Sequence, residues 1–581
     1  MTIDKMAFNS FEVFDLDEYS SPFLDLLLFC LRLSIHRLSM MASNIIRYLV
    51  VMVGAIPLVL SSKPVLQPTP PMGYNNWAAL MCGLNETVFV ETAQYMIKYG
   101  LLDAGYNRIN LDDCWSTMSR AANGSMEWDR EKFPRGLPWL TNYLKELGFI
   151  PGIYTDAGNL SCGGYPGAFG FEALDAQTFA DWGFEYVKLD GCNMPTGTEA
   201  EYKSVYGRWH DVLEDIRDAT GNPMIFSESA PAYFAENANL TDWYSVMNWV
   251  PKFGQLARHS RDSLVFNSTL YWPDITGWDS IMFNYGQEVR LSRYQRPGYF
   301  NDPDFLNVDH FDYTLDERKS HFALWSSFSA PLIISAWMPN LNSTEIEYLG
   351  NMGIIAVDQD PLAAQATLVS QDGTWDVLTK ELANGDRLLT ILNRGNCTAS
   401  HSVSFARIGL PDLHMVHVKD LWTGHSTRAF KEVTAQDVPS HGTAIFRLSA
   451  PKGRCSSVPT GMIFNTFSLA TLTASSGGVS WTNSSAADEQ VWQTRSDGTI
   501  RALANPSTCL TDLGEGKLGL ARCSRRAAQK WDYTYSGNVL SRSSNMCLTE
   551  ADGGTAILNA CLDQVDSQVI ALPSGVKIIG S

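Results

Sequence analysis

Carboxylate side chains follow several short apolar runs of this sequence, and Asp190 is the most distinctive of them. It ends the strand-like part of Phe184–Asn193, FEYVKLDGCN, after which Gly191 turns the chain. A carboxylate at the carboxyl-terminal end of a buried parallel strand lies where a β/α barrel opens its pocket, so Asp190 is a candidate nucleophile. Lys188 falls on the same strand face, and its ammonium would favour the ionised carboxylate. Alternatively, Asp190 could only cap the following helix.

Two further pairs of acids follow apolar runs in the same way. Asp112 and Asp113 end the run YNRINLDDCW, and Asp302 and Asp304 lie in PGYFNDPDFL. Acids and aromatic side chains gathered at one pocket favour glycoside hydrolysis, which uses two carboxyl groups and a surface on which a sugar ring stacks. The same acids could instead bind a divalent cation. Because no Cys/His cluster in the sequence has the spacing of a metal site, we expect no metal and no cofactor.

The composition is that of a multidomain globular protein. The chain has 581 residues, 45% of them hydrophobic, which is enough for two or three cores. Its net charge of −19 argues against a nucleic acid or an anionic membrane surface as partner, because both require clustered Lys and Arg. The 17 Trp and 22 Tyr residues are compatible with sugar binding, although most such side chains fill cores.

The amino-terminal 62 residues have the pattern of a leader. Residues 1–40 are acidic ahead of their apolar run, which does not suit an export signal. From Met41 the sequence has a short basic region, an apolar segment too short to span a membrane, and two small residues. This pattern predicts a signal peptide over 41–62, translation from Met40 or Met41, and a secreted, extracellular protein that begins near Lys63.

Sequence triplets and cysteines indicate the same secretory route. Most of the 11 cysteines fall into plausible pairs, as is typical of an oxidising compartment. Eight Asn-X-Ser/Thr triplets predict N-linked glycosylation at Asn85, Asn123, Asn159, Asn239, Asn267, Asn342, Asn396 and Asn483.

Residues 63–357 alternate short apolar runs with helix-length amphipathic segments, which is the pattern of βαβ units. The eight runs that we expect to be strands start at Met72, Tyr106, Phe149, Phe184, Pro223, Tyr244, Pro297 and Pro331. Eight such units predict a catalytic (β/α)8 TIM barrel. Alternating runs with Gly, Asn and Asp turns then predict an antiparallel β sandwich over residues 358–455.

An internal repeat occupies residues 456–581. Gln490, Gln529 and Gln568 recur at a spacing of 39, which predicts a threefold architecture. The segment resembles a ricin-type, lectin-like β-trefoil. Sugar binding and a purely structural role both remain open for it, because the acid and aromatic residues of a sugar site are hard to place. The resemblance implies the disulfides Cys509–Cys523 and Cys547–Cys561.

Five motifs, in matching order and spacing, resemble glycoside hydrolase family 27, which contains α-galactosidases and α-N-acetylgalactosaminidases. They are PPMGYNNW, NLDDCW, GIYTDAGNLSCGG, YVKLDGCN and RPGYFNDPDFL, and the likeness covers residues 67–450. With the trefoil attached, the chain is most similar to secreted fungal members. The resemblance implies a retaining α-galactosidase that releases terminal α-D-galactose from galacto-oligosaccharides, galactomannans and galactolipids. Its nucleophile would be Asp190, and its acid/base would be Asp262 in ARHSRDS.

The resemblance also implies which side chains bind the sugar and which cysteines pair beside it. The implied binding set is Trp77, Asp112, Asp113, Tyr154, Lys188, Ser229, Ala232, Tyr233, Arg258 and Asp304. The implied disulfides are Cys82–Cys114 and Cys162–Cys192. Arg258 precedes Asp262 by four residues, a spacing that is also common for an ordinary ion pair. The flanking Arg261 and Ser263 depart from the family pattern.

Three other functions remain open. Ser229 and Ala232 match the small pair that α-N-acetylgalactosaminidases place around the C2 substituent, although a register shift of one residue would bring Glu228 there. The family scaffold also serves β-L-arabinopyranosidases, whose substrate lacks the C6 hydroxymethyl group. A non-catalytic galactoside lectin is disfavoured because both Asp190 and Asp262 are retained.

Since the trefoil brings no residue to the barrel site, its removal is expected to leave hydrolysis of small aryl galactosides nearly unchanged.

Overall fold

The computed structural model describes residues 64–235, 240–263, 275–410, 415–450, 457–476 and 478–579. The predicted signal peptide and the triplets at Asn239 and Asn267 lie outside these described residues. The chain from Val65 onward forms one structural unit.

Eight parallel strands form the first sheet, in the order β7-β6-β5-β4-β3-β2-β1-β8. An isolated parallel bridge between Leu306 and Ile334 joins the segment after β7 to β8 and closes the ring. The strands are β1 (Met72–Asn75), β2 (Arg108–Leu111), β3 (Ile150–Asp156), β4 (Tyr186–Asp190), β5 (Ile225–Glu228), β6 (Leu256–Arg258), β7 (Phe300–Asp302) and β8 (Leu332–Ile334).

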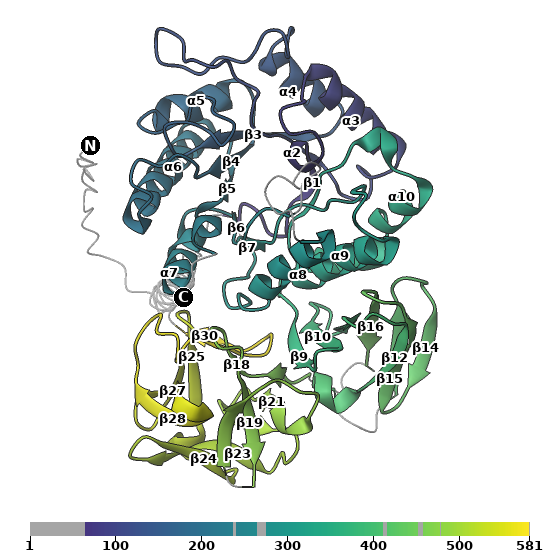
Figure 1. The fold of residues 1–581 in the computed structure, drawn as a ribbon, viewed down its shortest axis with the longest axis vertical. Helices are drawn as coiled ribbons and strands as arrows, with labels where there is room; N and C mark the ends of the chain where they lie inside the picture. Colours follow the sequence, from purple (N-terminus) through teal and green to yellow (C-terminus); the bar gives the residue numbers. More distant parts are fainter. Residues whose placement is uncertain are drawn as a thin grey trace, which may run out of the picture. The chain divides into compact units, whose positions relative to one another are not determined.

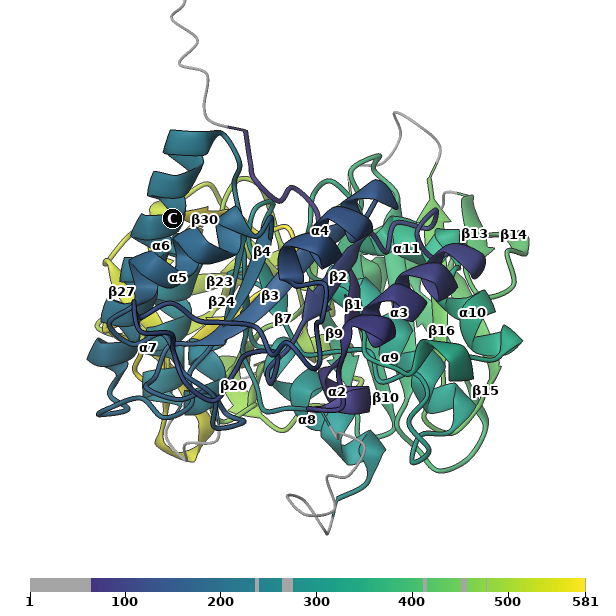
Figure 2. The same cartoon turned by 90° about the horizontal axis from the view of Figure 1, so that it is seen from above.

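Helices surround this ring in Figure 1, and helix α4 lies against strand β3, as the view from above in Figure 2 shows. They are α2 (Trp77–Leu80), α3 (Glu86–Lys98), α4 (Leu137–Glu146), α5 (Glu172–Asp181), α6 (Glu199–Thr220), α7 (Thr241–Trp249), α8 (Gly277–Glu288), α9 (Leu315–Phe328), α10 (Ser343–Leu349) and α11 (Met352–Asp358). Local sequence sets several of their ends. Thr276 and Thr314 begin capping boxes at α8 and α9, and Gly221 ends α6 in the left-handed conformation.

The predicted sixth strand is wrong. The run that starts at Tyr244 belongs to helix α7, and the sixth strand is β6, which ends at Arg258. Helix α7 is buried on most of its circumference, so its sequence lacks the polar stripe that reveals a surface helix. A short apolar run of this kind fits a buried strand and a buried helix equally well.

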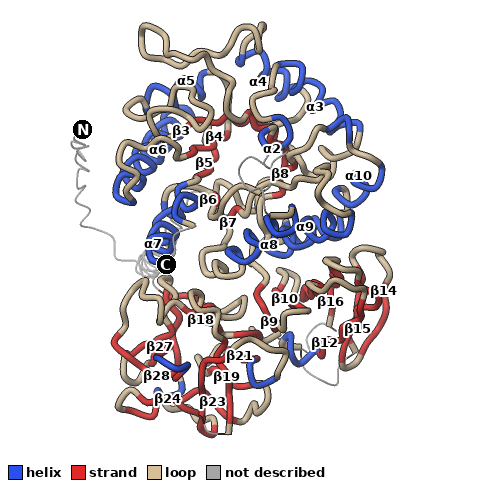
Figure 3. Tube along the Cα trace, viewed as in Figure 1, coloured by secondary structure: helices blue, strands red, loops and turns tan. Residues whose placement is uncertain are grey.

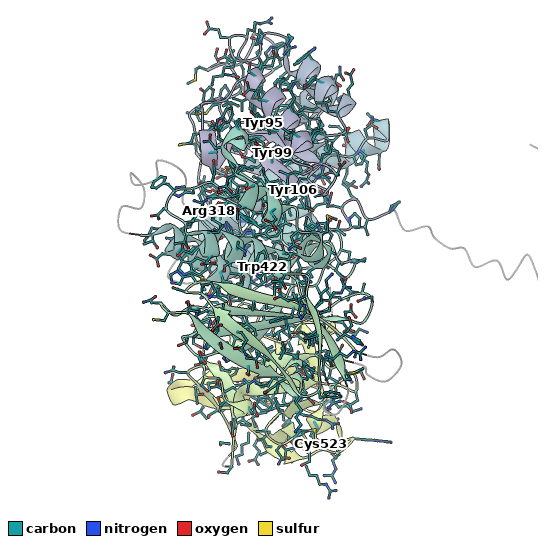
Figure 4. The ribbon with its side chains drawn as sticks, turned by 90° about the vertical axis from the view of Figure 1, so that its right-hand side faces the viewer. Tyr95, Tyr99, Tyr106, Arg318, Trp422 and Cys523 are labelled. Carbon is teal, nitrogen blue, oxygen red and sulfur yellow. A yellow bond between two sulfur atoms is a disulfide. The ribbon has the colours of Figure 1, made fainter. Side chains whose placement is uncertain are left out.

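The second domain consists of two antiparallel sheets. The larger sheet has the order β14-β13-β16-β11-β10-β9, the smaller pairs β12 with β15, and they enclose an apolar core. Helix α9 contacts this domain through Lys319, whose ammonium lies 4.5 Å from the ring centre of Trp422, a residue labelled in Figure 4. The strands are β9 (Thr367–Gln371), β10 (Trp375–Glu381), β11 (Arg387–Asn393), β12 (Ala399–Ser404), β13 (Val416–Asp420), β14 (Ser426–Ala429), β15 (Glu432–Val438) and β16 (Thr443–Ser449).

The third domain is built from short strands, drawn in red in Figure 3. They are β17 (Thr460–Met462), β18 (Phe464–Asn465), β19 (Thr471–Ser475), β20 (Gly478–Thr482), β21 (Val491–Thr494), β22 (Ile500–Ala502), β23 (Thr508–Gly514), β24 (Lys517–Arg522), β25 (Trp531–Thr534), β26 (Val539–Ser541), β27 (Met546–Ala551), β28 (Thr555–Ala560), β29 (Ile570–Ala571) and β30 (Ile578–Ile579).

The three repeats of this domain use the same internal contacts. Each repeat glutamine is buried, and its side-chain amide donates to a threonine hydroxyl at 2.9–3.1 Å; the pairs are Gln490–Thr473, Gln529–Thr511 and Gln568–Thr549. The residue two positions after each glutamine enters the common apolar core; these residues are Trp492, Trp531 and Ile570. The predicted sequence of a TIM barrel, a β sandwich and a β-trefoil is therefore confirmed.

No helix among the described residues has the length and apolarity required to cross a membrane.

Candidate active site

A cavity of about 520 Å³ opens at the carboxyl-terminal ends of the barrel strands. Seven predicted site residues line it: Trp77, Asp190, Ser229, Ala232, Tyr233, Arg258 and Asp262. The other five are buried and connect to lining residues or to one another by hydrogen bonds, ion pairs or a cation–ring contact; they are Asp112, Asp113, Tyr154, Lys188 and Asp304. The structure thus brings the whole predicted set together.

Asp190 is the last residue of β4, and three groups fix its carboxylate. The hydroxyl of Tyr233 donates to Oδ1 at 2.5 Å, and the amide of Gly191 donates to the same oxygen at 3.0 Å. The Nζ atom of Lys188 lies 3.9 Å from Oδ2. Burial, and then the charge of Asp190, raises the pKa of Tyr233 well above its ordinary value, so the tyrosine keeps the proton that it donates. Helix α6 is capped by Thr198, so Asp190 has no capping role there.

Lys188 joins the nucleophile side of the cavity to the acid pair after β2. Its Nζ atom donates to Oδ2 of Asp112 at 2.9 Å, and Asn75 donates to the same oxygen at 2.7 Å. Burial by itself lowers the pKa of Lys188, but the charges of Asp112 and Asp190 outweigh burial and raise it above its ordinary value. The ammonium is therefore charged at neutral pH. Its charge balances the carboxylates of Asp112 and Asp190, which are the kind of group that would otherwise bind a divalent cation.

Asp113, the residue after Asp112, holds the loop that contains Gly163. Its Oδ2 atom accepts from the amide of Gly163 at 2.7 Å, and its Oδ1 atom accepts from the amide of Cys114 at 2.7 Å. Burial raises the pKa of this carboxyl, and the hydrogen bond from Gly163 opposes the shift. Asp113 is thus held rigidly beside a lining residue of the cavity.

All four expected disulfides are present in the structure. They are Cys82–Cys114, Cys162–Cys192, Cys509–Cys523 and Cys547–Cys561, and Figure 4 labels Cys523 in the trefoil. The first two border the cavity, because Cys82, Cys162 and Cys192 line it. Each closes a loop of about 30 residues, and such crosslinks restrict the unfolded chain and hold the loops of the site together.

Asp156, the last residue of β3, was not predicted as a site residue. It pairs with Asp190 in the parallel register, and its carboxyl is fully buried. Its Oδ2 atom accepts from the amide of Cys192 at 3.0 Å, and its Oδ1 atom accepts from the amide of Gly158 at 2.7 Å. Burial, and then the charge of Asp190, raises the pKa of Asp156 well above its ordinary value. This acid therefore anchors the loop that follows the nucleophile.

The second catalytic candidate, Asp262, lies beyond the end of β6. The guanidinium of Arg258 donates a hydrogen bond to Asp262 at 2.9 Å and forms an ion pair with Asp304 at 2.8 Å, so one cation joins both acids. Asp304 also accepts from the amide of Ser263 at 2.6 Å. Burial raises the pKa of Asp304 to about 7, against the opposing effect of Arg258. Asp262 itself has a side chain that is 60% exposed, so it is open to water and to a leaving group.

Backbone strain accompanies these contacts. Asp304, Cys114 and Asn193 have positive φ angles of 88°, 73° and 50°, a region that residues other than glycine rarely adopt. All three lie next to site loops, and such conformations persist only where surrounding contacts enforce them. The contacts around the cavity therefore hold these three residues in strained conformations.

The loop after β5 presents small residues to the cavity. Ser229 and Ala232 line it, and the hydroxyl of Ser229 is buried without a protein partner, as is that of the lining residue Ser260. Glu228 is fully buried and does not line the cavity. Burial raises the pKa of Glu228 well above its ordinary value. The structure thus has the register in which serine, and not glutamate, faces the cavity.

The cluster that could approach a metal ion among the described residues is Asp156 with Cys162 and Cys192, but the two sulfur atoms are bonded to each other. Thiolate ligands are therefore not available there.

Six of the predicted glycosylation sites lie in the described chain, and each asparagine is exposed: Asn85, Asn123, Asn159, Asn342, Asn396 and Asn483.

Comparison with known proteins matches all three domains. Residues 69–360 match the family described as Alpha galactosidase A, and residues 372–448 match the Alpha galactosidase C-terminal beta sandwich domain. Residues 460–569 match the Ricin-type beta-trefoil lectin domain.

Individual relatives agree with these matches. Alpha-galactosidase A of Aspergillus niger is 51% identical over 523 residues, which are 89% of this chain and 94% of that protein. The crystal structure of alpha-galactosidase I from Mortierella vinacea is 27% identical, with a TM-score of 0.61 over 68% of this chain and 100% of that one. An α-galactosidase structure from Saccharomyces cerevisiae is 25% identical, with a TM-score of 0.57 over 66% of this chain and 98% of that one.

The acid-rich pocket of the barrel and the matched proteins indicate the same enzyme class. The family membership that the five short motifs predict is confirmed. The chain belongs to the α-galactosidase A family of glycoside hydrolases, in a form that carries a ricin-type β-trefoil.

Proposed function

We propose that this α-galactosidase cleaves terminal α-D-galactosides with retention of configuration, using Asp190 as nucleophile and Asp262 as acid/base. The observation that carries the proposal is the contrast between two carboxyl groups of one cavity. Asp190 is 17% exposed and oriented by three partners, whereas Asp262 is 60% exposed. A retaining glycosidase needs a fixed nucleophile and a second carboxyl group that exchanges protons with the leaving group and with water.

In the first step a carboxylate oxygen of Asp190 forms a bond to the anomeric carbon while the bond to the glycosidic oxygen breaks. Protonated Asp262 gives its proton to that oxygen, and the aglycone leaves as a neutral alcohol. The charge of Arg258, 2.9 Å from Asp262, stabilises the carboxylate that remains.

In the second step Asp262 takes a proton from a water molecule, which attacks the anomeric carbon and displaces Asp190. Tyr233 and Lys188 stabilise the departing carboxylate, because both interact with it in the resting enzyme. Two displacements at one carbon return the α configuration. Free galactose is the product.

The remaining site residues are proposed to hold the sugar. Asp112 and Asp113 accept from hydroxyl groups of the ring, Trp77 covers its apolar face, and Tyr154 supports Lys188, whose Nζ lies 5.0 Å from its ring centre. The proposed substrates are galacto-oligosaccharides, galactomannans and galactolipids, and we propose that the enzyme acts outside the cell after removal of the leader over residues 41–62.

Product stereochemistry and covalent trapping test this mechanism. Proton NMR during hydrolysis of p-nitrophenyl α-galactoside is expected to show α-galactose as the first product, and initial formation of β-galactose would refute retention. A slow fluorinated galactosyl substrate is expected to label one peptide, the one that contains Asp190, when the protein is digested and analysed by mass spectrometry. A label on another acid would move the nucleophile.

A second activity is favoured by the loop after β5. Ser229 and Ala232 leave space beside the cavity, and the unpartnered hydroxyl of Ser229 can bind a polar substituent. We propose a side activity on α-N-acetylgalactosaminides. The double variant Ser229→Glu/Ala232→Leu is expected to lower kcat/KM for the p-nitrophenyl N-acetylgalactosaminide by about 100-fold, while sparing the galactoside. Complete absence of N-acetyl activity in the wild type would refute this assignment.

A further inference from the structure

The trefoil shares a core with the barrel. Trefoil side chains belong to the same buried apolar cluster as the barrel helices; they are Met462, Phe464, Val569 and Ala571. Next to them, the ring of Phe467 packs against Tyr244 of helix α7 with their centres 5.0 Å apart. Tyr244 is fully buried, so this contact is made inside the protein and not across a wet surface. Removing either ring would leave a cavity under α7.

A buried arginine joins the trefoil to the barrel segment that follows helix α8. Arg293 follows α8, and its Nε atom donates to the backbone oxygen of Tyr535 at 3.2 Å. Its guanidinium lies 5.0 Å from the ring centre of Tyr244, and the neighbouring Tyr294 meets Tyr535 edge to face at 5.2 Å. Because Arg293 is buried, its hydrogen bonds are costly to lose. Helix α7 and the segment that follows α8 are thus both fastened to the trefoil.

Helices α7 and α8 both contact His259, the residue that follows β6. Trp243, on α7, donates from its indole nitrogen to the backbone oxygen of His259 at 2.8 Å. The imidazole of His259 lies 2.6 Å from the carboxylate of Glu288 at the end of α8, and both side chains are fully buried. His259 directly follows Arg258, the residue whose guanidinium holds Asp262 at 2.9 Å. Ring contacts from Phe467 to Trp243, a hydrogen bond to the His259 backbone and the peptide chain to Arg258 therefore connect the trefoil to the acid/base.

We propose that the trefoil is a positioning element for the acid/base side of the active site, and that Phe467 and Tyr535 are its positioning residues. The inference rests on the proposed role of Asp262. The expectation that trefoil removal spares small aryl galactosides rests on the absence of trefoil residues from the cavity lining, but a module can contribute no lining residue and still fix the helices behind one. Two of the groups that hold the nucleophile, Lys188 and the Gly191 amide, belong to β4 and its loop, whereas Tyr233 belongs to the loop after β5, which also contacts α7.

This placement has a chemical signature. If the support behind β6 is lost, Asp262 shifts relative to the glycosidic oxygen while Asp190 keeps its partners on β4. Protonation of the leaving group then suffers, and attack at the anomeric carbon does not. The loss should be large for galactosides with alkyl or sugar leaving groups, which require a proton, and small for aryl galactosides whose phenolate leaves unaided. A general loss of folded enzyme would lower both activities equally.

The experiment uses the full chain and the variant Phe467→Ala, with Leu558→Ala as matched control. Leu558 is buried in the trefoil core and belongs to a cluster separate from that of the barrel. kcat/KM is measured for melibiose and for an activated aryl galactoside, well below the melting temperature of each variant. Phe467→Ala is expected to lower the melibiose value about 10- to 100-fold and the aryl value by less than twofold, whereas Leu558→Ala keeps their ratio. Equal losses, or an unchanged ratio in Phe467→Ala, would overturn the inference.

Two further measurements complete the test. If Phe467→Ala does not fold, Phe467→Leu keeps most of the apolar volume, and the same shift in ratio is expected at smaller size. In the Asp262→Ala background, Phe467→Ala is expected to add no further change in the ratio. If Asp262→Ala alone leaves the ratio unchanged, the acid/base assignment falls together with the inference. If Asp262→Ala changes the ratio and Phe467→Ala does not, only the inference falls.

Discussion

The two catalytic carboxyl groups are held in opposite ways. Asp190 is 17% exposed, ends a central barrel strand, and accepts hydrogen bonds from Tyr233 and from the backbone of its own loop. Asp262 lies past the end of its strand, is 60% exposed, and is held by the guanidinium of Arg258. A group that attacks carbon benefits from a single orientation, whereas a group that exchanges protons with water needs access to it.

The surroundings of the two groups differ in the same sense. Around Asp190, a buried acid, Asp156, and the disulfide Cys162–Cys192 tie adjacent strand ends together. Around Asp262, the fixed elements are the arginine and Asp304, and the supports behind them come from helices α7 and α8. Precision at the nucleophile is thus local, and precision at the acid/base depends on contacts made farther away.

Replacing the nucleophile should have the largest effect. Asp190→Asn cannot form the glycosyl ester, so turnover of any galactoside is expected to fall below detection while the fold is kept. Circular dichroism and galactose binding by calorimetry check the fold and the site. Measurable turnover by a protein of confirmed sequence would show that another group attacks the anomeric carbon.

Replacing the acid/base should have a smaller and substrate-dependent effect. In Asp262→Ala, hydrolysis of sugar-linked galactosides is expected to fall about 10²- to 10⁴-fold, the usual contribution of general acid–base catalysis. Activated aryl galactosides should still form the glycosyl enzyme rapidly. Because small anions can reach an exposed position, added azide should restore turnover of the aryl substrate and yield a galactosyl azide. Failure of azide to increase the rate would point to a different acid.

Loosening the nucleophile loop should have an intermediate to small effect on rate. Asp156→Asn keeps one acceptor oxygen but places an amide group where the other accepted from a backbone N–H, so one anchor of the loop is lost. We expect kcat to fall about tenfold with both aryl and sugar leaving groups, because orientation of the nucleophile affects both. A change confined to sugar-linked substrates would mean that Asp156 supports the acid/base side instead.

The smallest expected effect is the pH dependence of stability at the same position. Burial raises the pKa of Asp156 in the folded protein, so the folded state binds more protons than the unfolded state above the unfolded pKa of about 4. The contribution of Asp156 to the free energy of unfolding must therefore decline as pH rises from about 4. Chemical unfolding of wild type and Asp156→Asn at pH 4.5, 5.5 and 7 should show the difference, wild type minus variant, becoming less positive. An increase with pH would mean that Asp156 folds as a stabilised carboxylate.

Much of this arrangement could be predicted from sequence because parallel strands place their carboxyl ends together. Asp112, Asp190 and Asp304 each follow a short apolar run, and the barrel rule alone gathers them. The spacing of the repeat glutamines likewise predicts the trefoil, and each glutamine makes the same kind of hydrogen bond, to a threonine of its own repeat.

The failures came from contacts that sequence spacing does not encode. The apolar run of helix α7 wrongly predicts a strand, because burial on most sides removes the polar stripe of the helix. The strand β6 is only three residues long, and its sequence does not predict a strand. Asp156 stands in a recognised motif, yet its role depends on the amide of Cys192, which reaches it from the next strand. No pattern within one segment reveals a partner of that kind.

The shared apolar cluster of barrel and trefoil also decides how the protein comes apart. Domains that meet through a polar linker melt one after another, whereas domains that contribute side chains to one core lose them together. Because Phe464 and Val569 lie in the barrel cluster, separating the trefoil from the barrel would expose apolar side chains of both domains, and this cost couples their unfolding. Heat capacity traces of the enzyme should accordingly contain one endotherm for both domains, and a protease that cuts between them should release no stable lectin-like fragment.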